Sequence, residues 1–238
     1  MRQEKLGDLL VRITGGTDGR GGGNGPVVVL LHGYGAPGDD LVVLSEYLDV
    51  PAGTRFLFPE APLPIPLGYG DSRGWWLIDM ARIQADRAAG RIRDLSGEIP
   101  VGLVRARERA AGLLDDMHRK LGVDPKKTIL GGFSQGAMLS CDVLLRSDRP
   151  YAGLIQLSGT LLAKQEWGPL LLKRKALPVF QSHGTQDPIL AYVMAERLRD
   201  DFVRAGLKVE WLPFRGGHEI PEPVLRKLGR FIQLHLGR

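Results

Sequence analysis

Residues 132–136 read Gly-Phe-Ser-Gln-Gly and fit the pattern Gly-x-Ser-x-Gly. The run at 128–130 before the motif is typical of a strand, and residues 135–146 after it have the pattern of a helix. In this context the motif predicts a sharp strand-to-helix turn with Ser134 exposed at its tip. A side chain at either flanking position would collide with a neighbouring element, which explains glycine at both.

Strands and helices alternate on both sides of this motif. Apolar runs predict strands at 9–14, 27–31, 55–58, 128–130, 154–157, 179–182 and 209–212. Helical periodicity predicts helices at 40–48, 100–121, 135–146, 189–205 and 223–235. The continuous apolar run at 27–31 is typical of a strand buried on both faces of a sheet. We therefore expect an α/β protein with a doubly wound, mostly parallel sheet, in which residues 1–238 form a single domain.

Three regions show neither pattern clearly. Residues 15–25 contain seven glycines in eleven positions, which predicts a flexible loop. Residues 59–100 begin with a proline-rich stretch and predict an irregular loop region on the substrate side of the sheet. A shorter variable stretch surrounds Trp167. Sites in such sheets lie beyond the carboxyl ends of the strands, so the chemistry is expected in the connecting loops.

The composition is that of a globular protein with a large core. Of the 238 residues, 43% are apolar and 25% are charged, so folding needs neither disulfides nor metals. The one cysteine, Cys141, is interpreted as a small buried apolar side chain. No apolar run approaches the roughly 20 residues that cross a bilayer, and the first residues lead into no apolar signal segment. These features predict a cytoplasmic protein without stable membrane insertion.

The net charge of +5 reflects a small basic excess that is spread along the chain. Nucleic-acid binding would need a basic stripe interleaved with aromatic residues, so we expect no nucleic-acid partner. Arginines are densest between residues 82 and 109, where seven arginines are mixed with four acidic residues. The main interpretation of this segment is a solvated surface. The alternative is a surface that attracts anionic headgroups or acidic protein.

Ser134 needs a base, because a serine hydroxyl is a weak nucleophile until its proton is removed. After such a turn, the acid and the histidine follow the serine along the chain. Asp187 comes after the strand at 179–182, and His218 comes in a glycine-containing loop after the strand at 209–212. We expect His218 to act as the base and Asp187 to orient it. Asp187 has a second interpretation, since Asp-Pro often starts a turn and caps a helix.

Two backbone N–H groups are expected to hold the negative charge that develops on a substrate oxygen. They belong to Gln135, directly after the serine, and to Tyr34, in the loop after the strand at 27–31. His32 is interpreted as an organiser of that loop, and His183 as a structural residue. The histidines are dispersed, so the sequence predicts no metal site.

Together the motifs resemble the phospholipase/carboxylesterase family of serine hydrolases, to which acyl-protein thioesterases belong. The matching segments follow the family's order between about residues 26 and 236: Leu-His-Gly-Tyr-Gly at 31–35, Pro-Glu-Ala-Pro at 59–62, Gly-Phe-Ser-Gln-Gly at 132–136, His-Gly-Thr-Gln-Asp-Pro at 183–188 and Gly-His-Glu-Ile-Pro at 217–221. The resemblance implies an α/β-hydrolase fold, no cofactor, and hydrolysis of carboxylic esters or thioesters. The segments at 73–79 and 80–99 depart from the family pattern, which leaves the substrate open.

We thus expect a serine carboxylesterase that cleaves short- to medium-chain esters through an acyl-enzyme intermediate. One alternative is an acyl-protein thioesterase or lysophospholipase that acts on longer acyl chains, and another is a non-catalytic ligand-binding module on a hydrolase scaffold. Trp75 and Trp76 are expected either in the core or on the wall of an acyl pocket. The expected partner is a small-molecule ester or acyl substrate. A homodimer is compatible with the sequence, which fixes neither the physiological substrate nor the chain-length preference.

Overall fold

The fold is built on one twisted sheet with helices on both faces. The computed structural model describes residues 1–66 and 70–237. Its strands are Arg2–Leu6 (β1), Leu9–Gly16 (β2), Arg20–Gly22 (β3), Val27–Leu31 (β4), Arg55–Pro59 (β5), Leu63–Pro64 (β6), Arg73–Gly74 (β7), Thr128–Phe133 (β8), Gly153–Leu157 (β9), Pro178–Gly184 (β10) and Lys208–Phe214 (β11). Its α-helices are Leu44–Tyr47 (α1), Met80–Ala88 (α2), Leu103–Lys120 (α3), Gln135–Arg146 (α4), Lys164–Leu171 (α5), Tyr192–Arg204 (α6) and Glu222–Leu236 (α7), and short 3₁₀ turns lie at Pro125–Lys127 (η1) and Leu172–Arg174 (η2).

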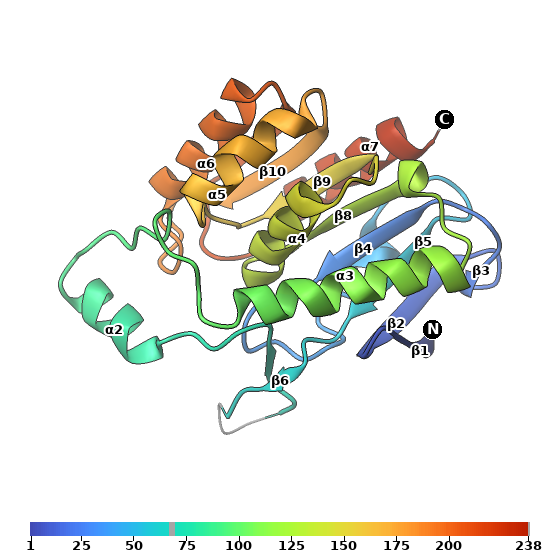
Figure 1. Cartoon of the computed structure of the whole chain (residues 1–238), viewed down its shortest axis with the longest axis horizontal. Helices are drawn as coiled ribbons and strands as arrows, with labels where there is room; N and C mark the ends of the chain where they lie inside the picture. The colour runs from blue at the N-terminus through green and yellow to red at the C-terminus, as the bar shows by residue number, and fades with distance from the viewer. Residues whose placement is uncertain (67–69, 238) are drawn as a thin grey trace.

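Within the described residues, nine strands form the main sheet. Their order is β1-β2-β5-β4-β8-β9-β10-β11, with β3 beside β2 (Figure 1). The β1–β2 and β2–β5 pairs are antiparallel, whereas every pair from β5 to β11 is parallel. β6 and β7 form a separate small hairpin. This confirms the prediction of an α/β protein with a mostly parallel, doubly wound sheet in one domain.

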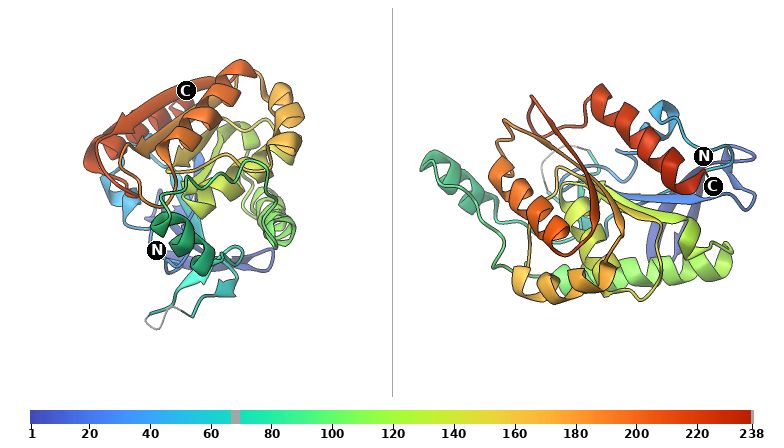
Figure 2. Two further views of the ribbon diagram at one scale, coloured as in Figure 1. Left: turned by 90° about the vertical axis from the view of Figure 1, so that its left-hand side faces the viewer. Right: turned by 90° about the horizontal axis from the view of Figure 1, so that it is seen from above.

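Helices cover both faces of the sheet. The core residues of α3, α4, α5 and α6 belong to one apolar cluster, and those of α1 and α7 belong to a second. Figure 2 shows α7 on one side of the sheet, with α3, α5 and α6 on the other. α4 is buried from Gln135 to Leu145, because it lies between the sheet and the neighbouring helices α3 and α5. Cys141 lies in this buried helix, and burial raises the pKa of its thiol well above the ordinary value, as expected of a small apolar side chain.

The strand order creates a crevice beside β8. β5 follows β4 in the chain and lies on one side of it, whereas β8 lies on the other side. The chain leaves β4 toward α1 on one face and leaves β8 into α4 on the other, so the two connections diverge. Such a switch point opens a site at the carboxyl ends of the strands. Tyr34, in the loop after β4, and Ser134, directly after β8, both line the cavity found there.

The prediction of a flexible loop at 15–25 is wrong over part of that segment. β2 continues to Gly16, and Arg20–Gly22 forms β3 beside it. Asp18 closes the turn between them, because its carboxylate accepts the N–H groups of Arg20 and Gly22, each at 2.8 Å. Gly16 has a φ of 71°, and a Cβ there would lie 2.4 Å from the Gly22 oxygen. Glycine at position 16 therefore allows β2 and β3 to pair, because any side chain there would collide with β3.

Several helical predictions also need correction. Residues 40–48 form hydrogen-bonded turns, and only Leu44–Tyr47 is an α-helix. The region 59–100 is not irregular throughout, since it contains the β6–β7 hairpin and the helix α2. Most side chains of α2 are exposed, so no apolar face marks the helix in the sequence. The stretch around Trp167 is the helix α5, which forms despite Pro169 because Trp167 and Leu171 are anchored in the core.

The steric limits of the turn around Ser134 can be tested with two alanine substitutions. A Cβ at Gly136 would lie 2.0 Å from the Leu31 oxygen and 2.6 Å from the His32 oxygen. Both are backbone atoms at the end of β4, so we expect Gly136→Ala to lower the free energy of unfolding by about 3 kcal/mol or more. Gly112→Ala in α3 is the control: a Cβ there meets no atom within 4 Å, and alanine favours a helix by about 1 kcal/mol. Urea unfolding measures both, and equal stability of Gly136→Ala and wild type would contradict this account.

Candidate active site

Ser134 lies on a strained turn between β8 and α4. Its φ of 54° and ψ of −117° are unusual for a residue other than glycine. The turn is held on both sides, because the Ser134 N–H donates to the Leu157 oxygen at 2.9 Å and the Met138 N–H donates to the Ser134 oxygen at 3.1 Å. A Cβ at Gly132 would lie 2.4 Å from the oxygen of Leu31. The backbone at the end of β4 is therefore the element with which side chains at the flanking positions would collide.

His218 and Asp187 meet at the same edge of the sheet. Asp187 follows β10 and His218 follows β11, and the His218 Nδ1 lies 2.6 Å from the Asp187 Oδ2. An ionised carboxylate only accepts hydrogen bonds, so Nδ1 carries the proton and Nε2 is left as an acceptor. The His218 ring packs against Phe133, the residue before Ser134, with 4.7 Å between ring centroids. Ser134 and His218 line one cavity.

The Asp187 carboxylate is held by donors on both oxygens. Oδ1 accepts the N–H groups of Ile189 and Leu190 at 2.8 and 2.9 Å, so Asp187 also closes the turn expected of an Asp-Pro pair. The His183 Nε2 lies 3.2 Å from Oδ2 and 2.8 Å from the Leu190 oxygen, and it carries a proton because both neighbours are acceptors. Burial alone would raise the pKa of Asp187, but the hydrogen bonds from His183 and His218 outweigh it and hold that pKa well below its ordinary value.

Gly33, the residue before Tyr34, lies close to the serine. A Cβ at Gly33 would be 3.4 Å from the Ser134 Cβ. The His32 Nε2 accepts the Ala61 N–H at 3.0 Å, so the proton of the neutral ring is on Nδ1, which lies 2.8 Å from the Gly33 oxygen and donates to it. Burial lowers the pKa of His32 and favours this neutral form. Carbonyl and N–H point in opposite directions across a trans peptide, so His32 also fixes the direction of the Tyr34 N–H.

Gln135 contributes both backbone and side chain at the turn. As the first residue of α4, it has an N–H without a partner inside the helix. Its side-chain Oε1 accepts the Trp75 N–H at 2.8 Å, and its Nε2 donates to the Trp76 oxygen at 2.9 Å. The side-chain role was not predicted, because nothing in the sequence shows that residues 75 and 76 pack against this turn.

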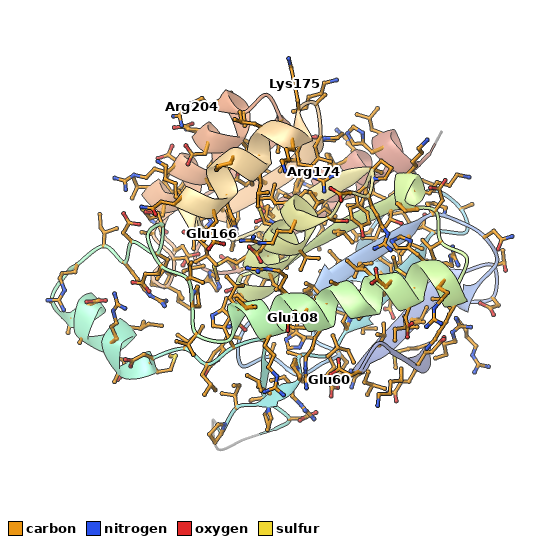
Figure 3. All side chains as sticks on the ribbon, viewed as in Figure 1. Glu60, Glu108, Glu166, Arg174, Lys175 and Arg204 are labelled. Carbon is orange, nitrogen blue, oxygen red and sulfur yellow. The ribbon has the colours of Figure 1, made fainter. Side chains whose placement is uncertain are left out.

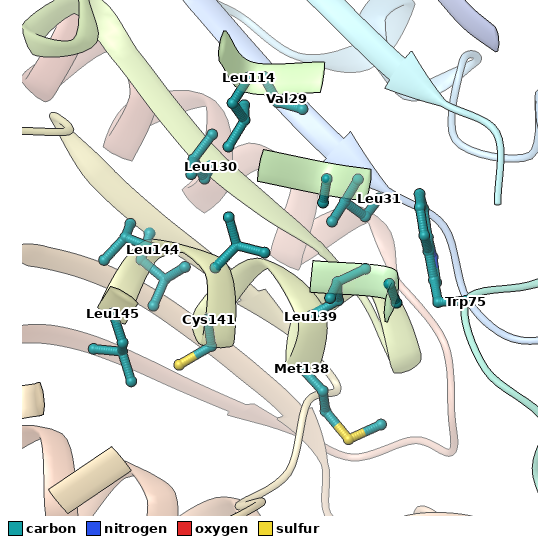
Figure 4. Close-up of a cluster of buried hydrophobic side chains, with 14 of the residues drawn as sticks. Val29, Leu31, Trp75, Leu114, Leu130, Met138, Leu139, Cys141, Leu144 and Leu145 are labelled. Atoms are coloured by element: carbon teal, nitrogen blue, oxygen red, sulfur yellow. The ribbon is translucent and has the colours of Figure 1, made fainter. Parts of the chain in front are cut away.

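The two tryptophans differ in their relation to the cavity. Both are buried in the larger apolar cluster. The Trp75 indole N–H donates to the His32 oxygen at 3.0 Å, and Figure 4 shows the ring beside Leu31 in the core. Trp76 also forms part of the cavity wall. Trp75 therefore fits the core interpretation, and Trp76 fits both.

Glu60 braces the far end of the loop that carries Tyr34. It lies near β6 (Figure 3), and its two carboxylate oxygens contact Arg12 at 2.8 Å and Arg73 at 3.3 Å. The backbone of Arg73 pairs with the same loop, donating to the Ala36 oxygen at 3.0 Å and accepting the Gly35 N–H at 2.7 Å. The sequence pattern marks Glu60 only as part of segment 59–62, because its pairing with two distant arginines leaves no local signal.

The cavity beside Ser134 has a volume of about 900 Å³. Its wall is largely apolar and includes Trp76, Leu77, Ile78, Met138 and Leu162. Segment 79–102, which contains α2 and stands away from the sheet in Figures 1 and 2, completes one side. A cavity of this size and character is typical of small-molecule sites. Within residues 1–66 and 70–237, no group of three or more His, Cys, Asp or Glu side chains could hold a metal ion.

This architecture is that of an α/β-hydrolase, in which a strained serine turn at the switch point of the sheet faces groups from the later strands. The chain belongs to the phospholipase/carboxylesterase family, whose profile matches residues 23–236. This confirms the family suggested by the motifs, and with it the expectation of an enzyme that hydrolyses carboxylic esters.

Individual relatives agree with this assignment. Acyl-protein thioesterase 1 of Candida albicans is 27% identical over 219 residues, which cover 87% of this chain and 90% of the relative. Acyl-protein thioesterase 1 of Kluyveromyces lactis is 36% identical over 172 residues, or 69% of this chain and 70% of the relative. Among solved structures, esterase PE8 is 27% identical, with a TM-score of 0.78 over 94% of this chain and 97% of that one. The Bacillus cereus carboxylesterase, at 20% identity and a TM-score of 0.68 over 95% and 94%, shares the fold.

The lowered pKa of Asp187 predicts how it contributes to stability as the pH changes. A carboxylate whose pKa is lower in the folded state stabilises the fold above its unfolded pKa, about 3.9, and loses that contribution as the pH falls toward the folded value. We expect the free energy of unfolding to fall less steeply in Asp187→Asn than in wild type between about pH 5 and pH 2. Urea unfolding at a series of pH values measures the slopes. Parallel slopes would mean that Asp187 takes up no proton in this range on unfolding.

Proposed function

We propose that this protein is a serine carboxylesterase in which Ser134 is the nucleophile, His218 the base and Asp187 the residue that orients the base. The observation that supports this most strongly is the 2.6 Å contact between His218 Nδ1 and Asp187, which leaves Nε2 as an acceptor on a cavity wall shared with Ser134. The strained backbone of Ser134 adds support, because residues held in such conformations cluster at reactive sites.

In the proposed mechanism Ser134 attacks the acyl carbon while His218 Nε2 takes the hydroxyl proton. The N–H groups of Tyr34 and Gln135 stabilise the oxyanion, and each such donor is worth roughly 100- to 1000-fold in rate. His218 then gives its proton to the leaving oxygen, and an acyl-enzyme remains. Water hydrolyses the acyl-enzyme with His218 again as base. Asp187 remains ionised throughout, as its lowered pKa requires.

We propose short- to medium-chain esters as the substrates. The apolar wall of the cavity, which includes Trp76 and Met138, would take the acyl chain. The second candidate is a thioesterase or lysophospholipase that acts on longer chains, and the relatives named acyl-protein thioesterase 1 favour it. Each additional buried methylene contributes about 0.8 kcal/mol, so chain length separates the two candidates.

We also propose that the enzyme works in the cytoplasm on small-molecule substrates. The single cysteine is buried and unpaired, which suits a reducing compartment. No helix in the described part of the chain is long and apolar enough to cross a membrane.

Hydrolysis of p-nitrophenyl esters from acetate to palmitate tests the nucleophile and the acyl preference together. We expect wild-type activity to peak below about ten carbons and Ser134→Ala to lose at least about 1000-fold in kcat. Ser140→Ala, on α4 but buried against the sheet, is the control for general damage to this helix. A peak at longer chains would favour the thioesterase candidate. Unchanged turnover in Ser134→Ala would contradict Ser134 as the nucleophile, and no turnover in wild type would favour a non-catalytic binding module.

Two substitutions of His32 test whether it directs the Tyr34 N–H. Asparagine keeps a donor near the Gly33 oxygen but loses the acceptor for Ala61, whereas glutamine keeps the acceptor and loses the donor. We expect His32→Gln to lower kcat about tenfold with little change in KM, and His32→Asn to stay closer to wild type. Steady-state kinetics measures this difference. Equal losses in both variants, in proportion to their lost stability, would assign His32 a structural role only.

A further inference from the structure

Arg93 is a cation on the cavity wall that forms no ion pair with the part of the chain that the structure describes. It lies in segment 79–102 and lines both the cavity beside Ser134 and a smaller hollow of about 210 Å³. Its Nε is buried without a hydrogen-bond partner, and within the described residues its guanidinium enters no ion pair. Burial lowers its pKa from the ordinary value, yet arginine stays charged at neutral pH. The side chain is half-buried, so the unpaired Nε carries the desolvation cost, which a ligand that accepts hydrogen bonds from the guanidinium can offset.

The carboxylates near this guanidinium are engaged elsewhere. Glu98 pairs with Arg82 at 2.7 Å, and Asp86 pairs with Arg91 at 2.8 Å. Asp79 caps α2, because it accepts the N–H of Arg82 at 2.9 Å. All three still raise the local density of negative charge, which favours a singly charged ligand over a phosphate monoester. A carboxylate suits the planar guanidinium, since it can accept two parallel hydrogen bonds.

The position of Arg93 indicates which part of a substrate it would meet. The smaller hollow is also lined by Asp187, Pro188 and Ile189, so Arg93 lies on the side of the cavity that carries the partner of His218. In acyl transfer the protonated histidine donates to the leaving atom, so the leaving group lies on the histidine side. Besides Asp79 and Glu98, the cavity wall carries the acidic residue Asp40, which belongs to the loop after β4 and not to segment 79–102.

We infer that Arg93 binds a carboxylate on the alcohol or thiol part of the ester substrate. This inference rests on the proposed function and narrows its substrate class to esters with an anionic leaving part. The cavity of about 900 Å³ has room for such a part beside an acyl chain. The arginine-rich segment, first interpreted as a solvated surface, then includes one residue that selects substrates.

Matched esters that differ in one charge test this inference. The anionic substrate is 4-butyryloxybenzoate, and the neutral one is methyl 4-butyryloxybenzoate. The leaving groups differ in intrinsic reactivity, so the quantity compared is the ratio of the two kcat/KM values in each variant, which cancels that difference. Arg93→Gln removes the cation. Arg105→Gln is the matched control, because Arg105 is an exposed arginine on α3 that lines neither hollow.

We expect the anionic-to-neutral ratio to be about tenfold lower in Arg93→Gln than in wild type, mainly through KM, and unchanged in Arg105→Gln. Added salt should lower the wild-type ratio. A ratio that is the same in wild type and Arg93→Gln would overturn the inference. A second pair, mono-p-nitrophenyl adipate and p-nitrophenyl hexanoate, carries the charge difference on the acyl side. If Arg93→Gln changes the kcat/KM ratio of this pair only, the inference is also overturned. If Ser134→Ala still hydrolyses these esters, the proposed function fails, whereas Ser134-dependent turnover without an Arg93 effect contradicts this inference alone.

Discussion

The close approach of the end of β4 to the turn around Ser134 is the contact on which the rest of the site depends. The Leu31 oxygen would lie 2.4 Å from a Cβ at Gly132 and 2.0 Å from one at Gly136, so only glycine fits at either position. The same approach brings Gly33 close to Ser134, since a Cβ at Gly33 would lie 3.4 Å from the Ser134 Cβ. One backbone contact thus places the strained serine beside the loop that carries Tyr34. Because β4 and β8 are adjacent parallel strands, their pairing fixes the separation of the two segments that follow them.

Hydrogen bonds from two buried side chains extend this rigidity around the site. His32 joins the loop after β4 to Ala61, and its backbone oxygen accepts from the Trp75 indole. The Gln135 side chain then holds the backbone of Trp75 and Trp76 against the start of α4. Segments that are distant in the sequence therefore share one network around the cavity. Donors held in this way need little reorganisation when charge develops, which is the arrangement that favours oxyanion stabilisation.

The sequence predicted best those features whose residue pattern is dictated directly by their place in the fold. The apolar run of β4 and the glycines around Ser134 are constrained by the buried sheet itself, so their pattern survives in the sequence. Asp187 and His218 could be named because strand ends converge in a parallel sheet, and the structure brings them within 2.6 Å. α5 was missed because its proline and glycine contradict helix propensity, which packing overrides. The bonds of the Gln135 side chain could not be predicted, since they join positions about 60 residues apart.

Charge and chain length would contribute comparably to substrate selection in such a site. A tenfold preference corresponds to about 1.4 kcal/mol, close to the burial of two methylene groups at about 0.8 kcal/mol each. Arg93 is half-buried, so solvent screening limits its contribution to this range. An anionic leaving part could then offset an acyl chain that is two carbons shorter. It follows that neutral esters report the apolar wall that includes Trp76 and Met138 but not the contribution of Arg93. Two enzymes with the same acyl profile could therefore differ in physiological substrate if only one carried an unpaired cation at this position.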